Sequence, residues 1–380
     1  EAADQGLRVI ILEARPWLGG FFDYRAAVSA QDQPLYQRAK DLAAKVQEKD
    51  NIRVFLQTSM VGAYTDNLIT AFQQGGPGDS FEQRYIEIRA KGVVVATGCR
   101  ERPLLFENNE RPGIMQIACA HRLARTYGLL PGEQAVFSVG HDLGLEAAVD
   151  LFDLGLDVQA VADCREEGQD ANLVQALQDR KIPFYPGWVG QEALGRPTVN
   201  KVRISSIDGT VTREFSCDLL VASAGLTPVT EPLSLVQSRF EFDQHTGYFL
   251  PVDYPAGMFP AGRIWGLNHS GSIEASGHLA GLHAAAACGA ECNQELRAAE
   301  QAMHSLPGAE AGSKVVTAPV PGRKSFLCFD EDVSVKNIKQ ALTPCFDLPE
   351  LIKPFSAAGT RPGQSAIPGT NHQILVATLK

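Results

Sequence analysis

The sequence lacks three features that would assign it to a membrane, to nucleic acid or to secretion. It has no run of about 18 apolar residues, so no transmembrane helix is expected. It has no basic excess: 34 Lys and Arg against 44 Asp and Glu give a formal net charge of −10, which argues against nucleic-acid and anionic-membrane surfaces. The first residues, EAADQGLRVIILE, lack the charged start, apolar centre and cleavage site of a signal peptide.

Cysteine pairs of the CxxC type are also missing. The eight cysteines are scattered, which removes the usual redox-active dithiol and the common zinc spacings. Cys288 and Cys292 stand four residues apart on a predicted helix, where two small core residues are favoured over a pair of metal ligands. We therefore predict no metal site and a reducing, cytoplasmic location.

What the sequence does contain is an ordinary globular composition. Its 380 residues are 44% hydrophobic and 21% charged. This length predicts two or three domains, each with a sizeable core.

The N-terminal segment is typical of part of a βαβ unit. Leu7 to Leu12 is a continuous apolar run that ends at Glu13, as in a buried parallel strand. Gly6, just before it, fits the left-handed position that ends a helix. The glycine turn of such a unit would precede Glu1, and the last residues could begin another element, so we expect a sequence truncated at both ends.

The elements that follow predict an α/β protein of the two-dinucleotide-binding-domain flavoprotein type, with nested Rossmann units and a small C-terminal helical domain. A helix from Pro34 to Glu48, with Asp32 as a possible N-cap, precedes short strands that form a meander. The predicted parts are a first dinucleotide-binding domain without its N-terminal part (1–112), a nested nucleotide-binding-like domain (113–250), a return to the first domain (251–305), a linker (306–323), a helical domain (324–360) and a tail (361–380).

The first unit retains one element of a nucleotide site. Such a site needs a glycine turn and a helix N-terminus for the pyrophosphate, and an acid at the tip of the second strand for the ribose. The acid is Glu13. Taken alone, Glu13 is as readily explained by an ordinary surface charge as by a ribose-binding role. The following RPWLGG, which ends at Gly20, favours the site because its glycines let the chain pass close over a nucleotide.

The second unit departs from the GxGxxG pattern. In VGHDLGLE, from Val139, only Gly144 matches a glycine, and Val139 and His141 stand at the other two positions. Asp163 follows about twenty residues on, where a ribose-binding acid is expected. We favour a degenerate site that binds no dinucleotide well.

Two buried strands end in similar tight exits, VVVATG from Val93 and LLVASAG from Leu219. The pair makes Thr97 and Gly98 candidate binding residues. MFPAG, which ends at Gly262, resembles the strand that runs under the pyrophosphate and flavin of flavin enzymes. An Asp usually follows that glycine, and Arg263 in its place counts against flavin binding.

With these motifs the chain resembles the alpha subunit of heterotetrameric sarcosine oxidase and its relatives among amino-acid and opine dehydrogenases and hydrogen cyanide synthase. The shared elements are the ATG exit with ERP at 101–103, RPGIM at 111–115, and then YG and PG. The segment FLCFDEDVSVKNIKQALTPCFDLPELIKPFSAAGTRPGQS resembles the middle domain of that subunit. The resemblance covers nearly the whole chain and is most specific in 91–136 and 326–364.

Some of these relatives hold an iron–sulfur cluster in that domain, through a CxC pair and a later Cys-Gln-Gly. Here Cys328 is followed by Phe329 and Asp330, and Gln364 is preceded by Gly363. One candidate thiolate is too few for a cluster. The sarcosine oxidase branch is similar in lacking it.

The resemblance implies a subunit of a complex that oxidises sarcosine to glycine, passes the methyl carbon to tetrahydrofolate and sends electrons to oxygen. It implies a beta subunit with the amine-oxidising flavin, smaller subunits, FMN at the alpha–beta boundary, and a folate-binding domain beyond this chain. It assigns no catalytic residue here. It implies NAD or FAD in the first site, with Glu13 on the adenosine ribose, Arg15 on the adenine side, Phe21 and Val61 lining the pocket, and Gly98 and Gly262 beside the phosphates.

Two other interpretations stay open. One is a self-sufficient FAD-dependent NAD(P)H reductase, or a subunit of an amino-acid or opine dehydrogenase. A reductase predicts intact glycine loops and an Asp after Gly262. The other is an inactive fragment, which the missing first glycine loop favours for the isolated chain.

Overall fold

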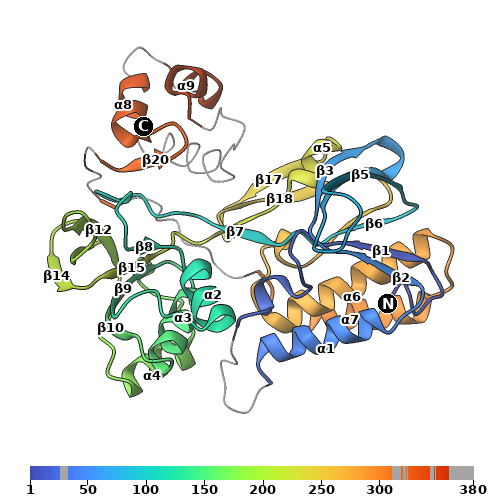
Figure 1. Ribbon diagram of the computed structural model, residues 1–380, viewed down its shortest axis with the longest axis horizontal. Coiled ribbons are helices and arrows are strands. Elements are labelled where there is room, and N and C mark those ends of the chain that lie inside the picture. The colour runs from blue at the N-terminus through green and yellow to red at the C-terminus, as the bar shows by residue number, and fades with distance from the viewer. Residues whose placement is uncertain are drawn as a thin grey trace. The chain divides into compact units, whose positions relative to one another are not determined.

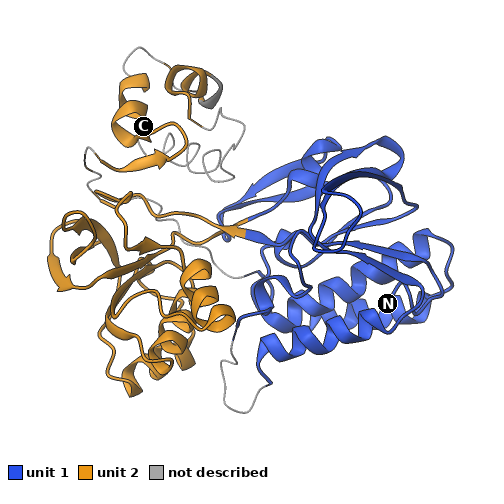
Figure 2. Ribbon diagram, in the orientation of Figure 1, with its two compact units in different colours: residues 1–99, 228–311 blue, residues 100–227, 312–380 orange. Residues whose placement is uncertain are grey.

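The structure is a computed structural model that describes residues 1–25, 33–309, 318–319, 322, 324–342, 346 and 348–358. The chain divides into two compact units, the first with residues 1–99 and 228–311 and the second with residues 100–227 and 312–380 (Figure 2). The chain passes between the units at β7 (Cys99–Glu101) and at β16 (Leu226–Pro228), and these two strands pair. Residues 100–227 are therefore inserted into the sequence of the first unit.

Two pairs of short parallel strands position the candidate site of the first unit. β1 (Val9–Leu12) pairs with β2 (Ile52–Phe55), and β6 (Val93–Val95) pairs with β19 (Met258–Pro260) (Figure 1). The pairing of β19 with β6 places the predicted MFPAG strand beside the predicted VVVATG strand. Because both strands run in the same direction, the residues that follow them lie at the same edge.

Antiparallel strands and short connections complete the β-structure of the first unit. The meander predicted between the helix and the VVVATG strand is present as a three-stranded sheet, but its predicted first strand, residues 52–56, is β2 and pairs in parallel with β1 instead. A hairpin that the sequence did not reveal follows the inserted residues. The bounds are β3 (Thr58–Tyr64), η2 (Thr65–Asn67), β4 (Leu68–Gln74), β5 (Gln83–Arg89), α5 (Glu231–Leu235), β17 (Arg239–Asp243) and β18 (Tyr248–Asp253).

Three helices lie side by side in the first unit (Figure 1): α1 (Leu35–Gln47), α6 (Ser270–Ala287) and α7 (Asn293–His304). Pro34 stands at the N-cap of α1, and the predicted cap Asp32 lies outside the described residues. Arg38 of α1 forms an ion pair with Glu274 of α6 at 2.5 Å. Buried residues of α6 and α7, among them Leu282 and Ala299, form one apolar cluster.

The turn before β1 has the bonds predicted for a helix end, although residues 2–6 form turns and not a helix. The N–H of Leu7 donates to the carbonyl of Ala2 at 3.2 Å, and the N–H of Gly6 donates to that of Ala3 at 3.0 Å. These two bonds are those of a Schellman motif, and Gly6 has the left-handed φ of 78° that the motif requires.

The second unit contains a five-stranded, all-parallel sheet in the order β11-β10-β9-β15-β8. Three helices and a three-stranded antiparallel sheet accompany it. The bounds are β8 (Ile114–Met115), α2 (Ile117–Tyr127), β9 (Gln134–Val139), α3 (Asp142–Asp153), β10 (Asp157–Asp163), α4 (Ala171–Asp179), β11 (Phe184–Pro186), β12 (Trp188–Leu194), β13 (Lys201–Ser206), β14 (Thr212–Ser216) and β15 (Leu219–Ala222).

Alternation along the central strands sorts the core of this unit into two layers. Phe137 and Val221 pack in one cluster with residues of α2, α3 and α4, whereas Val136 and Leu220 pack in another with residues of β12 and β13. Successive strand residues point to opposite faces, so a sheet covered on both sides needs continuous apolar runs. The sequence supplies such runs in both strands.

The C-terminal module was predicted to be helical from Phe326 to about Phe355, and this is wrong at its start. A short hairpin of β20 (Phe326–Cys328) and β21 (Val333–Ser334) precedes the helices α8 (Val335–Leu342) and α9 (Pro349–Ser356). Leu327 and Val333 of the hairpin pack with Ile338 of α8 in one apolar cluster. Across the described residues, no helix has the length and apolar character needed to cross a membrane.

Candidate functional site

Glu13 directly follows β1, at the end of the β1–β2 pair. Its backbone continues the pairing, with its N–H donating to the carbonyl of Phe55 at 2.9 Å. Its carboxylate is half-buried and accepts the N–H of Arg15 on Oε1 at 2.8 Å. This bond holds the acid at the strand tip with its second oxygen available to a ligand hydroxyl.

The turn after Glu13 returns the chain over the end of β1. Gly19 and Gly20 have φ angles of 128° and 56°, a region that disfavours residues with a side chain. The Arg15 guanidinium donates to the carbonyl of Gly20 at 2.7 Å and so fixes the turn. The short helix η1 (Gly20–Phe22) then begins, and no atom lies within 4 Å of where a Cβ on Gly20 would be.

Thr97 and Gly98 form the exit from β6. The Thr97 hydroxyl donates to the carbonyl of Val229 at 2.6 Å, and the N–H of Val229 donates to the carbonyl of Gly98 at 2.9 Å. Gly98 has a φ of 75°, and a Cβ there would meet nothing within 4 Å. Thr97 therefore holds the turn, and Gly98 leaves space for a close approach.

Gly262 and Arg263 follow the neighbouring strand, β19, and begin the short helix η3 (Gly262–Trp265). Gly262 has a φ of 68°, and its N–H donates to the Ser276 hydroxyl at 2.9 Å. The Arg263 guanidinium lies 3.8 Å from the Cys99 sulfur and 5.2 Å from the centre of the Phe21 ring. Arg263 thus joins three segments that are far apart in the sequence.

The structure brings together all but one of the predicted binding residues. Contacts link Glu13 to Arg15, Arg15 to Gly20, and Phe21 through Arg263 to the residue after Gly98. Val61 stands apart: it lies half-exposed at an irregularity of β3, and no contact described for the structure connects it to this group. In the sequence Arg263 stands out only as a departure from the flavin pattern, and its contacts with Phe21 and Cys99 are not predictable from it.

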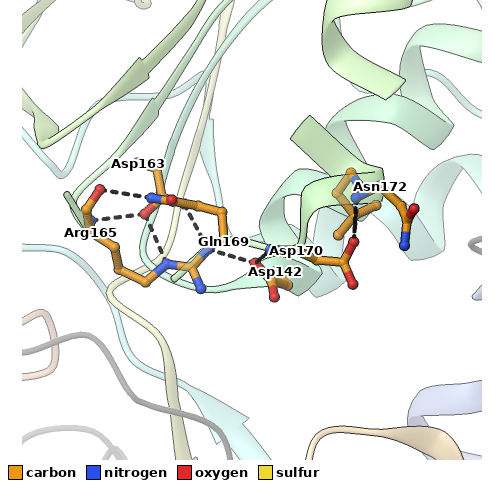
Figure 3. Close-up of polar contacts among 7 residues, drawn as sticks. Asp142, Asp163, Arg165, Gln169, Asp170 and Asn172 are labelled. Atoms are coloured by element: carbon orange, nitrogen blue, oxygen red, sulfur yellow. Dashed lines mark hydrogen bonds and ion pairs between the residues drawn. The ribbon is translucent and has the colours of Figure 1, made fainter. Parts of the chain in front are cut away.

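In the second unit the acid predicted to bind a ribose is bound by the chain itself. Asp163 ends β10 and is fully buried. Arg165 donates to both of its carboxylate oxygens, at 3.1 and 2.7 Å, and reaches Asp142 at 2.7 Å (Figure 3). Burial raises the pKa of Asp163, and the bonds from Arg165 offset part of that rise. Both carboxylate oxygens of Asp163 are thus already bound by Arg165.

Residues of the loop before α3 also pack against the chain itself. His141 is the N-cap of α3 and is buried, with Nε2 at 3.2 Å from the Ser223 hydroxyl. A Cβ on Gly144 would lie 2.5 Å from the Cβ of Val139. Gly144 therefore lets α3 pack closely on β9, which is a structural reason for the one glycine that matches the pattern.

The ERP motif has a structural explanation in this unit. Glu101 is buried and accepts the N–H groups of Ile117 at 3.1 Å and Ala118 at 2.6 Å, so its carboxyl caps the first turn of α2. Burial raises the pKa of Glu101 to about 7, although the Ala118 N–H and the Ser223 hydroxyl act against the rise. The buried Arg102 donates to the carbonyl of Ala224 at 3.2 Å.

The described part of the C-terminal module has few side chains that could bind a metal ion. Cys328 is 1% exposed. Within the described ranges no group of three or more His, Cys, Asp or Glu side chains could hold a metal ion. Cys345, Gly363 and Gln364 lie outside the described residues.

Comparison with known proteins links this architecture to redox proteins. A family model described as pyridine nucleotide-disulphide oxidoreductase matches residues 1–253, and one described as sarcosine oxidase A3 domain matches residues 322–380. The sarcosine oxidase subunit alpha of Corynebacterium sp. (strain P-1) is 26% identical over 387 residues, which are 97% of this chain and 39% of that protein. That of Corynebacterium sp. (strain U-96) is 27% identical over 389 residues, 97% of this chain and 40% of that protein.

The chain spans about two fifths of the length of these curated relatives. The crystal structure of L-proline dehydrogenase from P. horikoshii matches all of this chain and 71% of its own, with a TM-score of 0.74 at 20% identity. The predicted resemblance to sarcosine oxidase alpha subunits is confirmed, and so is the predicted two-dinucleotide-binding-domain fold.

Proposed function

The chain belongs to the pyridine nucleotide-disulphide oxidoreductase family, and from this premise we propose that it is the dinucleotide-binding part of an amine-oxidising subunit of the sarcosine oxidase type. The reaction of the whole complex would be the oxidative demethylation of sarcosine to glycine, with tetrahydrofolate receiving the methyl carbon and O₂ the electrons. The observation that carries the proposal is the match to sarcosine oxidase alpha subunits over 97% of the chain. The A3-domain match at the C-terminal end is a second, independent support.

The first unit would hold the dinucleotide, NAD or FAD. The chain would bind it through its adenosine and its pyrophosphate. Two observations favour a fit. Gly20 and Gly98 both have left-handed backbone and open space where a Cβ would be. Glu13 presents a half-buried carboxylate at the strand tip, where it can accept hydrogen bonds from ribose hydroxyls.

The amine would be oxidised on another subunit. We assign no catalytic residue to this chain. Three buried acids of its second unit already have partners: Asp163 is bound by Arg165, Asp150 by Arg125, and Glu101 by the start of α2. By the resemblance, the partners would be a beta subunit with a flavin, smaller subunits, and a folate-binding part beyond this chain, with FMN at a subunit boundary. The proposed location is the cytoplasm, in keeping with the described cysteines, none of which forms a disulfide with another.

The test is to purify the protein from its own cells through a tag on this chain, and to assay the complex and the isolated chain for hydrogen peroxide. We expect the complex to produce peroxide with sarcosine, and the isolated chain with added flavins to stay below about 1 turnover per second. Peroxide production by the isolated chain above that rate would mean that the active site lies here.

A second measurement distinguishes the proposed function from its main alternative. A self-sufficient FAD-dependent reductase would oxidise NADH or NADPH with an artificial acceptor in the isolated chain supplied with FAD. The proposed function predicts neither NADH nor NADPH turnover in the isolated chain. Turnover with either nucleotide, and none with sarcosine in the complex, would favour the reductase.

A further inference from the structure

Arg263 is a buried cation in the first unit, and its immediate partners are all neutral. The residue is 5% exposed. One guanidinium nitrogen, Nη1, donates to the amide oxygen of Asn268 at 3.1 Å and lies 3.8 Å from the Cys99 sulfur. The Phe21 ring lies beside the group, 5.2 Å from ring centre to Cζ.

The second nitrogen, Nη2, is buried and has no hydrogen-bond partner. No ion pair joins Arg263 to an acid in the part of the chain that the structure describes. A guanidinium stays charged in proteins, and a buried charge without a counter-charge is strongly unfavourable. The surroundings of Arg263 therefore lack one anion.

We propose that Arg263 binds a phosphate group of a nucleotide in the first site, an inference that rests on the dinucleotide site of the proposed function. Arg263 follows Gly262 at the end of β19, and Cys99 follows Gly98 at the end of the neighbouring β6. The guanidinium thus lies among the positive-φ turns where the backbone leaves space.

A nucleotide fits this arrangement better than an isolated anion because a second anchor belongs to the same group. Phe21, against which Arg263 packs, follows Gly20, and Gly20 is bound by Arg15 beside Glu13. Glu13 accepts hydrogen bonds from hydroxyls, and Arg263 donates to an anion, so one ligand that carries both a ribose and a phosphate satisfies both ends. A cation at this position also selects for the phosphate over an uncharged nucleoside.

The test compares three probes on the purified protein freed of bound nucleotide: ADP-ribose, adenosine, which has no phosphate, and inorganic phosphate. In titration calorimetry we expect Arg263→Gln to weaken ADP-ribose binding about 10- to 100-fold, the effect of losing a charged hydrogen bond. Adenosine binding should change by less than about twofold. Arg263→Lys, which keeps the charge, should lie between wild type and Arg263→Gln.

The ligand-free melting temperature gives a readout that a structural arginine would move in the opposite direction. Removal of an unpaired buried charge should leave the melting temperature of ligand-free Arg263→Gln equal to or above that of wild type. The rise that ADP-ribose gives should be smaller in Arg263→Gln than in wild type at the same ligand concentration. The matched control is Arg239→Gln, on an exposed arginine of the same unit that pairs with Glu241.

Four outcomes would overturn the inference. A lower ligand-free melting temperature with equal losses for ADP-ribose and adenosine would make Arg263 structural. Unchanged ADP-ribose binding in Arg263→Gln would remove Arg263 from the site but leave the dinucleotide site standing. Inorganic phosphate that binds wild type as tightly as ADP-ribose would assign a free anion, and wild type that binds neither ADP-ribose nor adenosine would contradict the proposed site itself.

Discussion

Arg165 donates two hydrogen bonds to the carboxylate of Asp163, from Nε at 3.1 Å and from Nη2 at 2.7 Å, two residues away in the sequence. Asp163 ends the second strand of a Rossmann-like unit, where a nucleotide-binding protein presents its ribose acid to the ligand. In this chain the acid has become part of an internal ion cluster that also includes Asp142 (Figure 3).

This cluster predicts a large difference between two arginines. Arg165→Ala leaves the buried Asp163 without its counter-charge and should lower the free energy of unfolding by about 3 kcal/mol. Arg180→Ala is the matched control, because Arg180 makes the same two-bond contact with Asp153 where both side chains are partly exposed, and should cost less than about 1 kcal/mol. Urea unfolding measures both, and equal losses would contradict the structural role given to Arg165.

Glu101 predicts a pH dependence of stability. Its pKa is raised by burial from 4.5 to about 7 in the folded protein. Between these values the native state keeps a proton that the unfolded chain has released, so this contribution to stability is full below the unfolded pKa and is lost as the pH rises through the folded one.

The comparison is with Glu101→Gln, whose amide oxygen can still accept the Ala118 N–H. From about pH 5 to about pH 8, the unfolding free energy of wild type should fall relative to that of Glu101→Gln by roughly 2–3 kcal/mol. Urea unfolding across this range measures the difference. Parallel pH profiles would show that the carboxyl of Glu101 titrates normally.

Two glycine substitutions in helices should act in opposite directions. Gly144→Ala puts a Cβ 2.5 Å from the Cβ of Val139, and the forced separation of α3 from β9 should cost roughly 1–3 kcal/mol. Gly277→Ala, on an exposed position of α6 with nothing within 4 Å, should instead stabilise by up to about 1 kcal/mol because alanine favours the helix. Circular dichroism during urea unfolding tests both, and a stable Gly144→Ala would remove the packing explanation of this glycine.

Glu13→Ala should weaken retention of the dinucleotide by roughly 1–3 kcal/mol, the cost of losing a charged hydrogen-bond partner. The measurement is the NAD and FAD released by acid from equal amounts of the purified complex. Glu87→Ala, on an exposed face of β5, serves as the control. Cofactor content that is the same in wild type, Glu13→Ala and the control would contradict the ribose role of Glu13.

The C-terminal module should contain no iron–sulfur cluster. The sequence gives the module two cysteines, Cys328 and Cys345, which are fewer than a cluster needs, and only Cys328 matches a cluster ligand of the relatives. Cys328 is 1% exposed and packs in the apolar cluster of the module. Iron and acid-labile sulfide assays on anaerobically purified protein should give far less than one equivalent of each. Stoichiometric amounts of both would overturn this.

The sequence by itself determined most elements of the fold. The runs Gln134–Val139 and Leu219–Ala222 predict two strands, because a continuous apolar run between turn residues is typical of a strand covered on both faces, and the structure gives both strands these bounds. The turn at Gly209 between β13 and β14 was equally clear, since Asp-Gly adopts the positive φ, here 75° at Gly209, that such a hairpin needs. Helices α2 and α7 and the β17–β18 hairpin were missed, although Phe240 and Phe242 alternate with charged residues along β17.

Only the tertiary structure decided which polar side chains meet. Periodicity places a residue on a face of its own element, but not opposite a particular residue of another element. Phe21, Cys99 and Arg263 come together because parallel strands from distant parts of the chain end at one edge of the first unit. Asp163 matches the sequence pattern of a ribose acid. Its bond to Arg165 cannot be predicted from that pattern, because it depends on the turn after β10 that places the guanidinium against the carboxylate.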